Sequence, residues 1–184
     1  MSDVSAFRTA HPRVRRWRGF TEDDAARLAG RVPAQHLRLL TEDGWSSYDD
    51  GLLWTVDPDE LGGISSRWVE GTPLFRTAFG NLLVWDGDVV WRADVHYGLV
   101  GVVAIDASFL YDDVLVRSKS VKALLDPTSV RRATKSAGEL APQEMYFWVP
   151  ALALGGAPET SQISRGGMVE ALTALAQSTP VLRR

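Results

Sequence analysis

The sequence of 184 residues contains no cysteine. Disulfides, thiolate nucleophiles and cysteine-ligated zinc are therefore excluded, and a reducing compartment suits such a chain. Long hydrophobic runs are also missing. The longest nearly apolar stretch, residues 145–158, contains two prolines and is shorter than the about 20 residues that cross a bilayer. No apolar segment of the kind found in signal peptides follows the first charges. We therefore expect a cytoplasmic protein without a membrane partner.

Neither sign of charge dominates, because 20 Lys and Arg residues face 23 Asp and Glu residues, for a net charge of −3. Nucleic-acid-binding proteins usually carry a strong basic excess, so we do not expect nucleic acid as a partner. Basic side chains do gather in the segment Arg8–Arg18. We expect residues 1–20 to be a solvated, mobile leader, and a nucleic-acid-binding arm is the alternative interpretation.

Signatures of catalysis and cofactor binding are scarce. The three histidines are far apart, and no phosphate-binding loop, dinucleotide fingerprint or nucleophile elbow is present. We expect no metal, no cofactor and no enzymatic activity. The most enzyme-like group is Asp94, His96 and Tyr97, where a carboxylate could orient an imidazole as general base. A turn completed by Gly98 explains the same residues, and no nucleophile accompanies them.

Three short runs rich in Val, Leu and Trp predict a β-meander over residues 76–105. Asp86-Gly87 suits the first tight turn, and the almost wholly apolar run 99–105 predicts a strand inside the sheet. Further strands are predicted near residues 51–56 and 145–149. The class is therefore α+β, an antiparallel sheet covered by several helices. We expect one domain over residues 21–184, with a soft division near residue 70.

Helix signals surround the meander. Thr21 with Asp24 predicts a capping box, and Asp57-Pro58 and Asp126-Pro127 are typical helix starts. In the helix after Pro127, apolar side chains should face inward while Arg131, Arg132 and Lys135 face outward. The last helix is predicted from about residue 167 to residue 177.

Acidic residues cluster in the expected loops and turns. Caps and turns explain most of them, but together they could form a negative surface for a basic protein partner, with a tryptophan as anchor. The residues predicted on this basis to bind such a partner are Asp49, Asp50, Trp54, Asp59, Asp86, Asp88 and Trp91.

Several stretches together resemble the GAD-like immunity proteins found beside bacterial toxins, including those of type VI secretion DNase effectors. They are GLLWTVDPDE (51–60), FGNLLVWD (79–86), DVHYG (94–98) and LAPQEMYFWVPALALGG (140–156), and the likeness extends over residues 32–177. The resemblance implies a non-enzymatic protein in the cytoplasm of the toxin-producing cell. It would bind a cognate toxin and block its active site or its access to substrate. The oligomeric state is left open.

Overall fold

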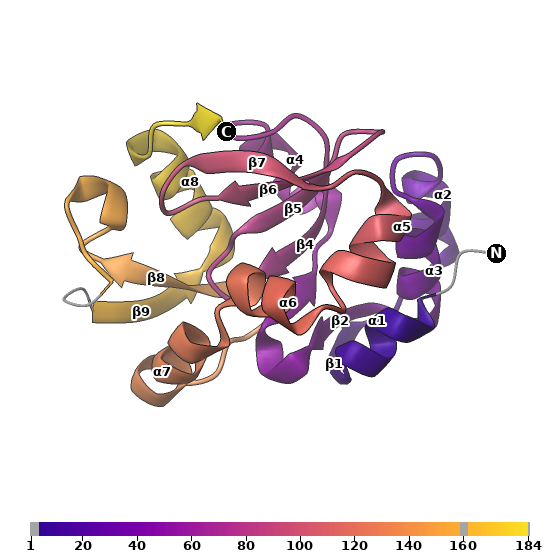
Figure 1. Cartoon of the computed structure of the whole chain (residues 1–184), viewed down its shortest axis with the longest axis horizontal. Helices are drawn as coiled ribbons and strands as arrows, with labels where there is room; N and C mark the ends of the chain where they lie inside the picture. Colours follow the sequence, from indigo (N-terminus) through magenta and orange to yellow (C-terminus); the bar gives the residue numbers. More distant parts are fainter. Residues whose placement is uncertain (1–3, 159–161, 184) are drawn as a thin grey trace.

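The computed structural model describes residues 4–158 and 162–183 and confirms the α+β class. Its main sheet has the strand order β1-β2-β3-β4-β5-β6-β7-β10 (Figure 1). Neighbouring strands are antiparallel except for the short parallel pair β7–β10. The strands are β1 (Arg13–Arg18), β2 (Trp45–Tyr48), β3 (Leu53–Thr55), β4 (Thr72–Thr77), β5 (Leu82–Trp85), β6 (Val90–Asp94), β7 (Leu99–Ala104) and β10 (Leu182–Arg183).

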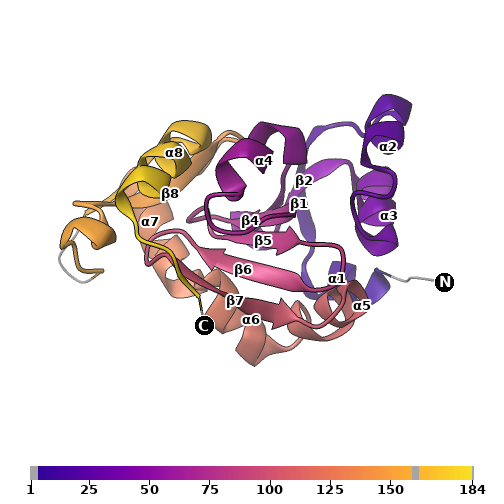
Figure 2. The ribbon, with the colours of Figure 1, turned by 90° about the horizontal axis from the view of Figure 1, so that it is seen from above.

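Helices lie on both sides of this sheet. Figure 2 shows α4 and α8 on one side and α5 and α6 on the other. The helical elements are α1 (Ser5–Ala10), α2 (Glu22–Leu28), α3 (Ala34–Asp43), η1 (Asp49–Gly51), α4 (Pro58–Ser65), α5 (Ala107–Phe109), η2 (Leu110–Val114), α6 (Ser118–Leu125), α7 (Pro127–Ala137), η3 (Leu152–Leu154) and α8 (Met168–Ser178).

The predicted caps are present where helices begin. The Thr21 hydroxyl accepts the Asp24 N–H at 3.1 Å, and the Asp24 carboxylate accepts the Thr21 N–H at 3.1 Å. Asp126 caps α7 by accepting the Ser129 N–H at 3.2 Å. These bonds satisfy backbone donors that have no partner inside the helix.

Each face of the sheet packs against its own hydrophobic cluster. Leu82 and Val84 of β5 belong to a cluster that includes α4 and α8 residues, whereas Leu83 between them belongs to a larger cluster. Successive side chains of a strand point to opposite faces, so β5 is buried on both sides. This double burial makes the sheet a rigid base for the loops at its ends.

Two strand predictions need correction. The segment predicted near 145–149 is a strand, β8 (Glu144–Val149), but it pairs with β9 (Gln162–Gly167) in a separate two-stranded sheet. Composition predicts a strand without choosing its partner, and here β9 supplies the hydrogen bonds. The run 99–105 was expected inside the sheet. It forms β7, which does lie between β6 and β10, but β10 pairs only with Leu99 and Val100, and Val102 is 50% exposed.

The expectation of a mobile basic leader is wrong for residues 5–18, which form α1 and the edge strand β1. Counter-charges hold several of its arginines in place. Arg8 pairs with Glu42 at 2.6 Å, and Arg18 pairs with Asp57 at 2.6 Å. The basic cluster is therefore largely neutralised by α3 and the start of α4. The division into one domain over 21–184 stays a prediction.

Candidate functional site

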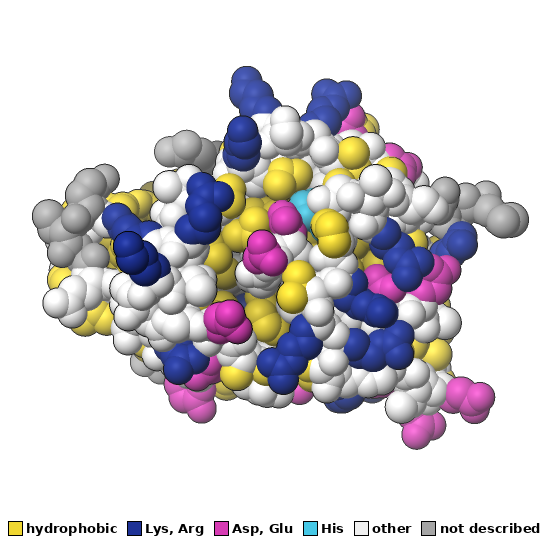
Figure 3. All heavy atoms as spheres, turned by 90° about the horizontal axis from the view of Figure 1, so that it is seen from below, with side chains coloured by type: hydrophobic (Ala, Val, Ile, Leu, Met, Phe, Trp, Pro, Cys, Tyr) yellow, Lys and Arg dark blue, Asp and Glu magenta, His cyan; other side chains and the backbone are white. Residues whose placement is uncertain are grey.

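A groove of about 730 Å³ separates the β1–β2–β3 end of the sheet from α6 and α7. Figure 3 views this side of the molecule and shows hydrophobic side chains in a central hollow, with acidic and basic side chains around it. One wall comes from the strands and η1 and includes Val14, Arg15, Asp49, Asp50, Leu52 and Trp54. The other wall comes from α6, α7 and the segment after α7 and includes Val121, Lys122, Val130, Arg131, Lys135, Glu139 and Leu140.

The η1 turn at the rim of the groove has an uncommon backbone. Asp49, Asp50 and Gly51 have φ values of 53°, 54° and 81°, so three consecutive residues are left-handed. Glycine adopts this region freely, but each aspartate there costs on the order of 1 kcal/mol. Such strain persists only where the surrounding structure imposes it.

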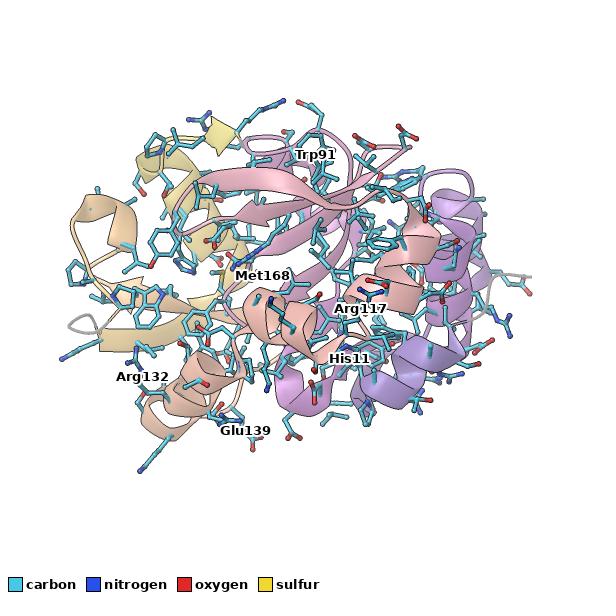
Figure 4. The ribbon with its side chains drawn as sticks, in the orientation of Figure 1. His11, Trp91, Arg117, Arg132, Glu139 and Met168 are labelled. Atoms are coloured by element: carbon cyan, nitrogen blue, oxygen red, sulfur yellow. The ribbon has the colours of Figure 1, made fainter. Side chains whose placement is uncertain are left out.

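Contacts from the N-terminal segment hold the turn in place. The Asp49 N–H donates to the Pro12 carbonyl at 3.0 Å, and His11 Nδ1 lies 3.5 Å from Asp49 Oδ2. The His11 ring is 1% exposed, and its Nε2 donates to the Leu115 carbonyl. In Figure 4 this histidine lies beside the end of α1, whereas Glu139 of the opposite wall lies below α7. The backbone of the turn is therefore held by the segment between α1 and β1.

Trp54 forms part of the groove wall and is fixed from two sides. Its indole N–H donates to the Gly51 carbonyl at 2.7 Å, and the Arg76 guanidinium lies 4.5 Å from the ring centroid. Burial lowers the pKa of Arg76 to about 9, so the side chain stays charged at neutral pH. Arg76 also donates to the Pro142 carbonyl at 2.9 Å. No feature of the sequence singled out this arginine.

Ion pairs hold some of the charged side chains of the fold and leave others, inside and outside the groove, without an ionic partner in the described chain. Around Arg27, for example, Asp24 and Asp57 are both paired at 2.8 Å. In the groove, six side chains have no ion-pair partner among residues 4–158 and 162–183. They are Arg15, Asp50, Lys122, Arg131, Lys135 and Glu139. Uncommitted charges beside apolar side chains are suited to binding a complementary surface.

The residues predicted to bind a protein partner fall in three separate places. Asp49, Asp50 and Trp54 lie together in the groove. Asp59 instead belongs to an ion-pair network, in which a hydrogen bond from Arg31 holds its pKa below the ordinary value.

The third group lies at the β5–β6 turn. There the Asp86 carboxylate accepts the backbone N–H of Asp88 at 2.9 Å and the Trp91 indole N–H at 2.7 Å. These hydrogen bonds account for Asp86 as a turn residue. Arg131 and Lys135 of the helical wall were among the outward-facing side chains predicted for α7. Their position opposite η1 depends on contacts between residues that are distant in sequence.

Two family models match separate segments of this chain. A family model described as GAD-like domain matches residues 5–97, half of the chain. The chain belongs to the GAD-like family. A second model, described as T6SS immunity protein Tdi1, C-terminal, matches residues 110–178 and supports an immunity-protein role. The match to the GAD-like model begins at residue 5, so the family likeness includes α1 and β1 and is wider than the range 32–177 predicted from the motifs.

A solved structure shares the fold of this GAD-like protein. The crystal structure of Atu4351 from Agrobacterium tumefaciens matches with a TM-score of 0.75 and 18% sequence identity. The match covers 98% of this chain and 91% of that chain. No curated protein matches this chain.

The groove lies where the two matched segments meet. The strand wall, from Val14 to Trp54, belongs to the GAD-like segment, and the helical wall, from Ser118 to Tyr146, belongs to the Tdi1-like segment. Neither segment alone forms the groove.

The alternative enzyme site occupies a second hollow of about 280 Å³. His96 is 3% exposed, donates from Nε2 to the Phe79 carbonyl at 2.8 Å, and has a pKa lowered by burial. Asp94 pairs with Arg92 at 3.1 Å, and no hydrogen bond within the described part of the chain joins it to His96. Tyr97 is 48% exposed. The three residues are close together, but the carboxylate does not orient the imidazole.

Within the described ranges, no group of three His, Cys, Asp or Glu side chains could hold a metal ion. The helices of those same ranges are all too short or too polar to span a bilayer.

Proposed function

We propose that this protein is the immunity partner of a type VI secretion nuclease toxin, and that it neutralises the toxin by binding it in the groove between η1 and α6–α7. The observation that carries this proposal is the set of unpaired charges around an apolar hollow, built jointly by the GAD-like and Tdi1-like segments. The protein would act in the cytoplasm of the producing cell, where a toxin without its partner would reach the chromosome.

The exposed apolar side chains of the groove would add to the binding energy. Leu52, Trp54 and Val130 of the groove are already buried in the free protein, whereas Val121 and Leu140 are partly exposed and Val14 is 55% exposed. Burying such side chains contributes roughly 25 cal/mol per Å² of apolar surface, and a few residues near the centre of an interface usually dominate its energetics. The charged rims would orient the toxin and speed its approach.

A nuclease is the favoured toxin because of the chemistry it requires. A nuclease must carry cations that bind the phosphate backbone, and unpaired carboxylates such as Asp50 are complementary to them. Blocking this surface would prevent substrate access without any catalytic group on the immunity protein. The resemblance to immunity proteins of DNase effectors supports the same choice.

Co-expression with the toxin encoded by the neighbouring open reading frame tests the proposal. The wild-type protein should restore growth and co-purify with the toxin. Lys122→Glu and Arg131→Glu should each weaken the complex by about tenfold or more, the equivalent of about 1.4 kcal/mol. Lys119→Glu is the matched control, because Lys119 lies on α6 with Lys122 but outside the groove. Failure of the wild-type protein to bind or protect would refute the proposal.

The hollow at His96 favours a second candidate, a small-molecule site used for binding or catalysis. A buried imidazole with a lowered pKa is a common feature of such sites. His96→Asn tests this alternative. Unchanged toxin protection with His96→Asn, together with loss under Arg131→Glu, would exclude the hollow as the working site, whereas the reverse pattern would support it.

A further inference from the structure

We infer that the groove receives the metal-binding active site of the toxin, with the toxin's carboxylates against the helical wall and its phosphate-binding cations against η1. This inference rests on the proposed nuclease function and adds the chemical identity of the surface that is bound. The partner is thus a protein surface in which acidic and basic groups lie side by side.

The signs of charge on the two walls determine this assignment. The helical wall carries Lys122, Arg131 and Lys135 against a single carboxylate, Glu139, whereas the strand wall carries Asp49 and Asp50 against a single cation, Arg15. A protein that imitated DNA would present acids alone to a nuclease. The cations of the helical wall require acidic groups on the partner, so simple imitation of the phosphate backbone does not account for the groove.

The active site of a metal-dependent nuclease has the required pattern. Carboxylates hold the divalent metal ions that activate the attacking water and stabilise the leaving oxygen. Basic side chains around them bind the phosphates on either side of the cleaved bond. Docked on this groove, the carboxylates would meet Lys122, Arg131 and Lys135, and the flanking cations would meet Asp49 and Asp50.

Ammonium and guanidinium groups on the helical wall would then take the place of the metal ions. The metal ions and these cationic side chains would neutralise the same toxin carboxylates, so the toxin could not bind the metal ions and this protein at once. Mg²⁺ and this protein should therefore compete for the toxin, beyond the general screening that any salt produces.

The geometry of η1 suits a fixed receptor. The Asp49 N–H donates to the Pro12 carbonyl at 3.0 Å and His11 Nδ1 lies 3.5 Å from Asp49 Oδ2, so little backbone ordering of η1 would accompany binding. All three cations of the opposite wall are exposed and lack ion pairs among the residues described, so they are available to a partner.

Titration calorimetry with the toxin from the neighbouring open reading frame tests the inference. The complex is measured in EDTA, in MgCl₂, and in NaCl at the ionic strength of the MgCl₂ buffer. We expect the Kd in MgCl₂ to be at least about tenfold weaker than in NaCl. The triple variant K122E/R131E/K135E should bind more weakly and lose this magnesium dependence, whereas K119E should keep it.

Equal Kd values in MgCl₂ and matched NaCl would overturn the inference while leaving the proposed function intact. Absence of a complex in every buffer would instead refute the proposed function. A groove occupied by a second copy of this chain would give a doubled mass by light scattering that the triple variant abolishes, and that result would also overturn the inference.

Discussion

Asp50 combines a strained backbone with a carboxylate that has no charged partner in the described chain. Asparagine and aspartate tolerate left-handed φ values better than other residues with a Cβ, and β-branched residues tolerate them least. The sequence Asp-Asp-Gly therefore suits a left-handed turn, although the signal in the sequence was only that of a polar loop. Its conformation depends on His11 and Pro12, about forty residues earlier.

Substitutions at Asp50 separate its backbone role from its charge. Asp50→Val should lower the free energy of unfolding by about 1–2 kcal/mol because a β-branched residue is strained at φ 54°. Asp50→Asn should leave stability nearly unchanged but weaken toxin binding. Urea unfolding and calorimetry measure the two effects. Equal stability of the Val and Asn variants would show that the turn is not held left-handed.

The element α2 is fastened to the start of α4 by one arginine. Arg27 forms paired hydrogen bonds with Asp57 at 2.8 and 3.0 Å and a further bond with Asp24 at 2.8 Å. Burial acts to raise the pKa of Asp57, but the bonds from Arg27 and Arg18 outweigh it, and the pKa is lowered. The sequence predicted both helix starts, but the ion pair between them could not be predicted from local patterns.

This network predicts a pH-dependent stability. Carboxylates whose pKa is lowered by folding stabilise the protein above their unfolded pKa of about 4, and that contribution disappears as the pH falls through the folded value. Arg27→Gln should therefore destabilise the protein by about 1–3 kcal/mol at pH 7, where hydrogen bonds to charged groups are lost. The difference from wild type should shrink below pH 4. Urea unfolding at several pH values measures it, and a pH-independent difference would contradict the network.

For the molecule as a whole, local patterns predicted the class, the helix caps and most of the meander. Alternation and turn residues determine these features over a few positions, as Asp86-Gly87 illustrates. Local sequence patterns did not predict contacts between elements that are distant in sequence. They did not show that Arg13–Arg18 would join the sheet edge, that β8 would pair with β9, or that η1 would face α7. The groove belongs to this second kind of feature, and only three of its residues were predicted.

Hydrogen exchange of this protein, alone and with its toxin, tests most directly whether the groove is the binding surface. We predict slower backbone exchange in the complex at η1 and along the exposed turns of α6 and α7. The β5–β6 turn, which contains Asp86 and Asp88, should exchange as in the free protein. Protection confined to that turn, with unchanged exchange at η1 and α7, would contradict the account.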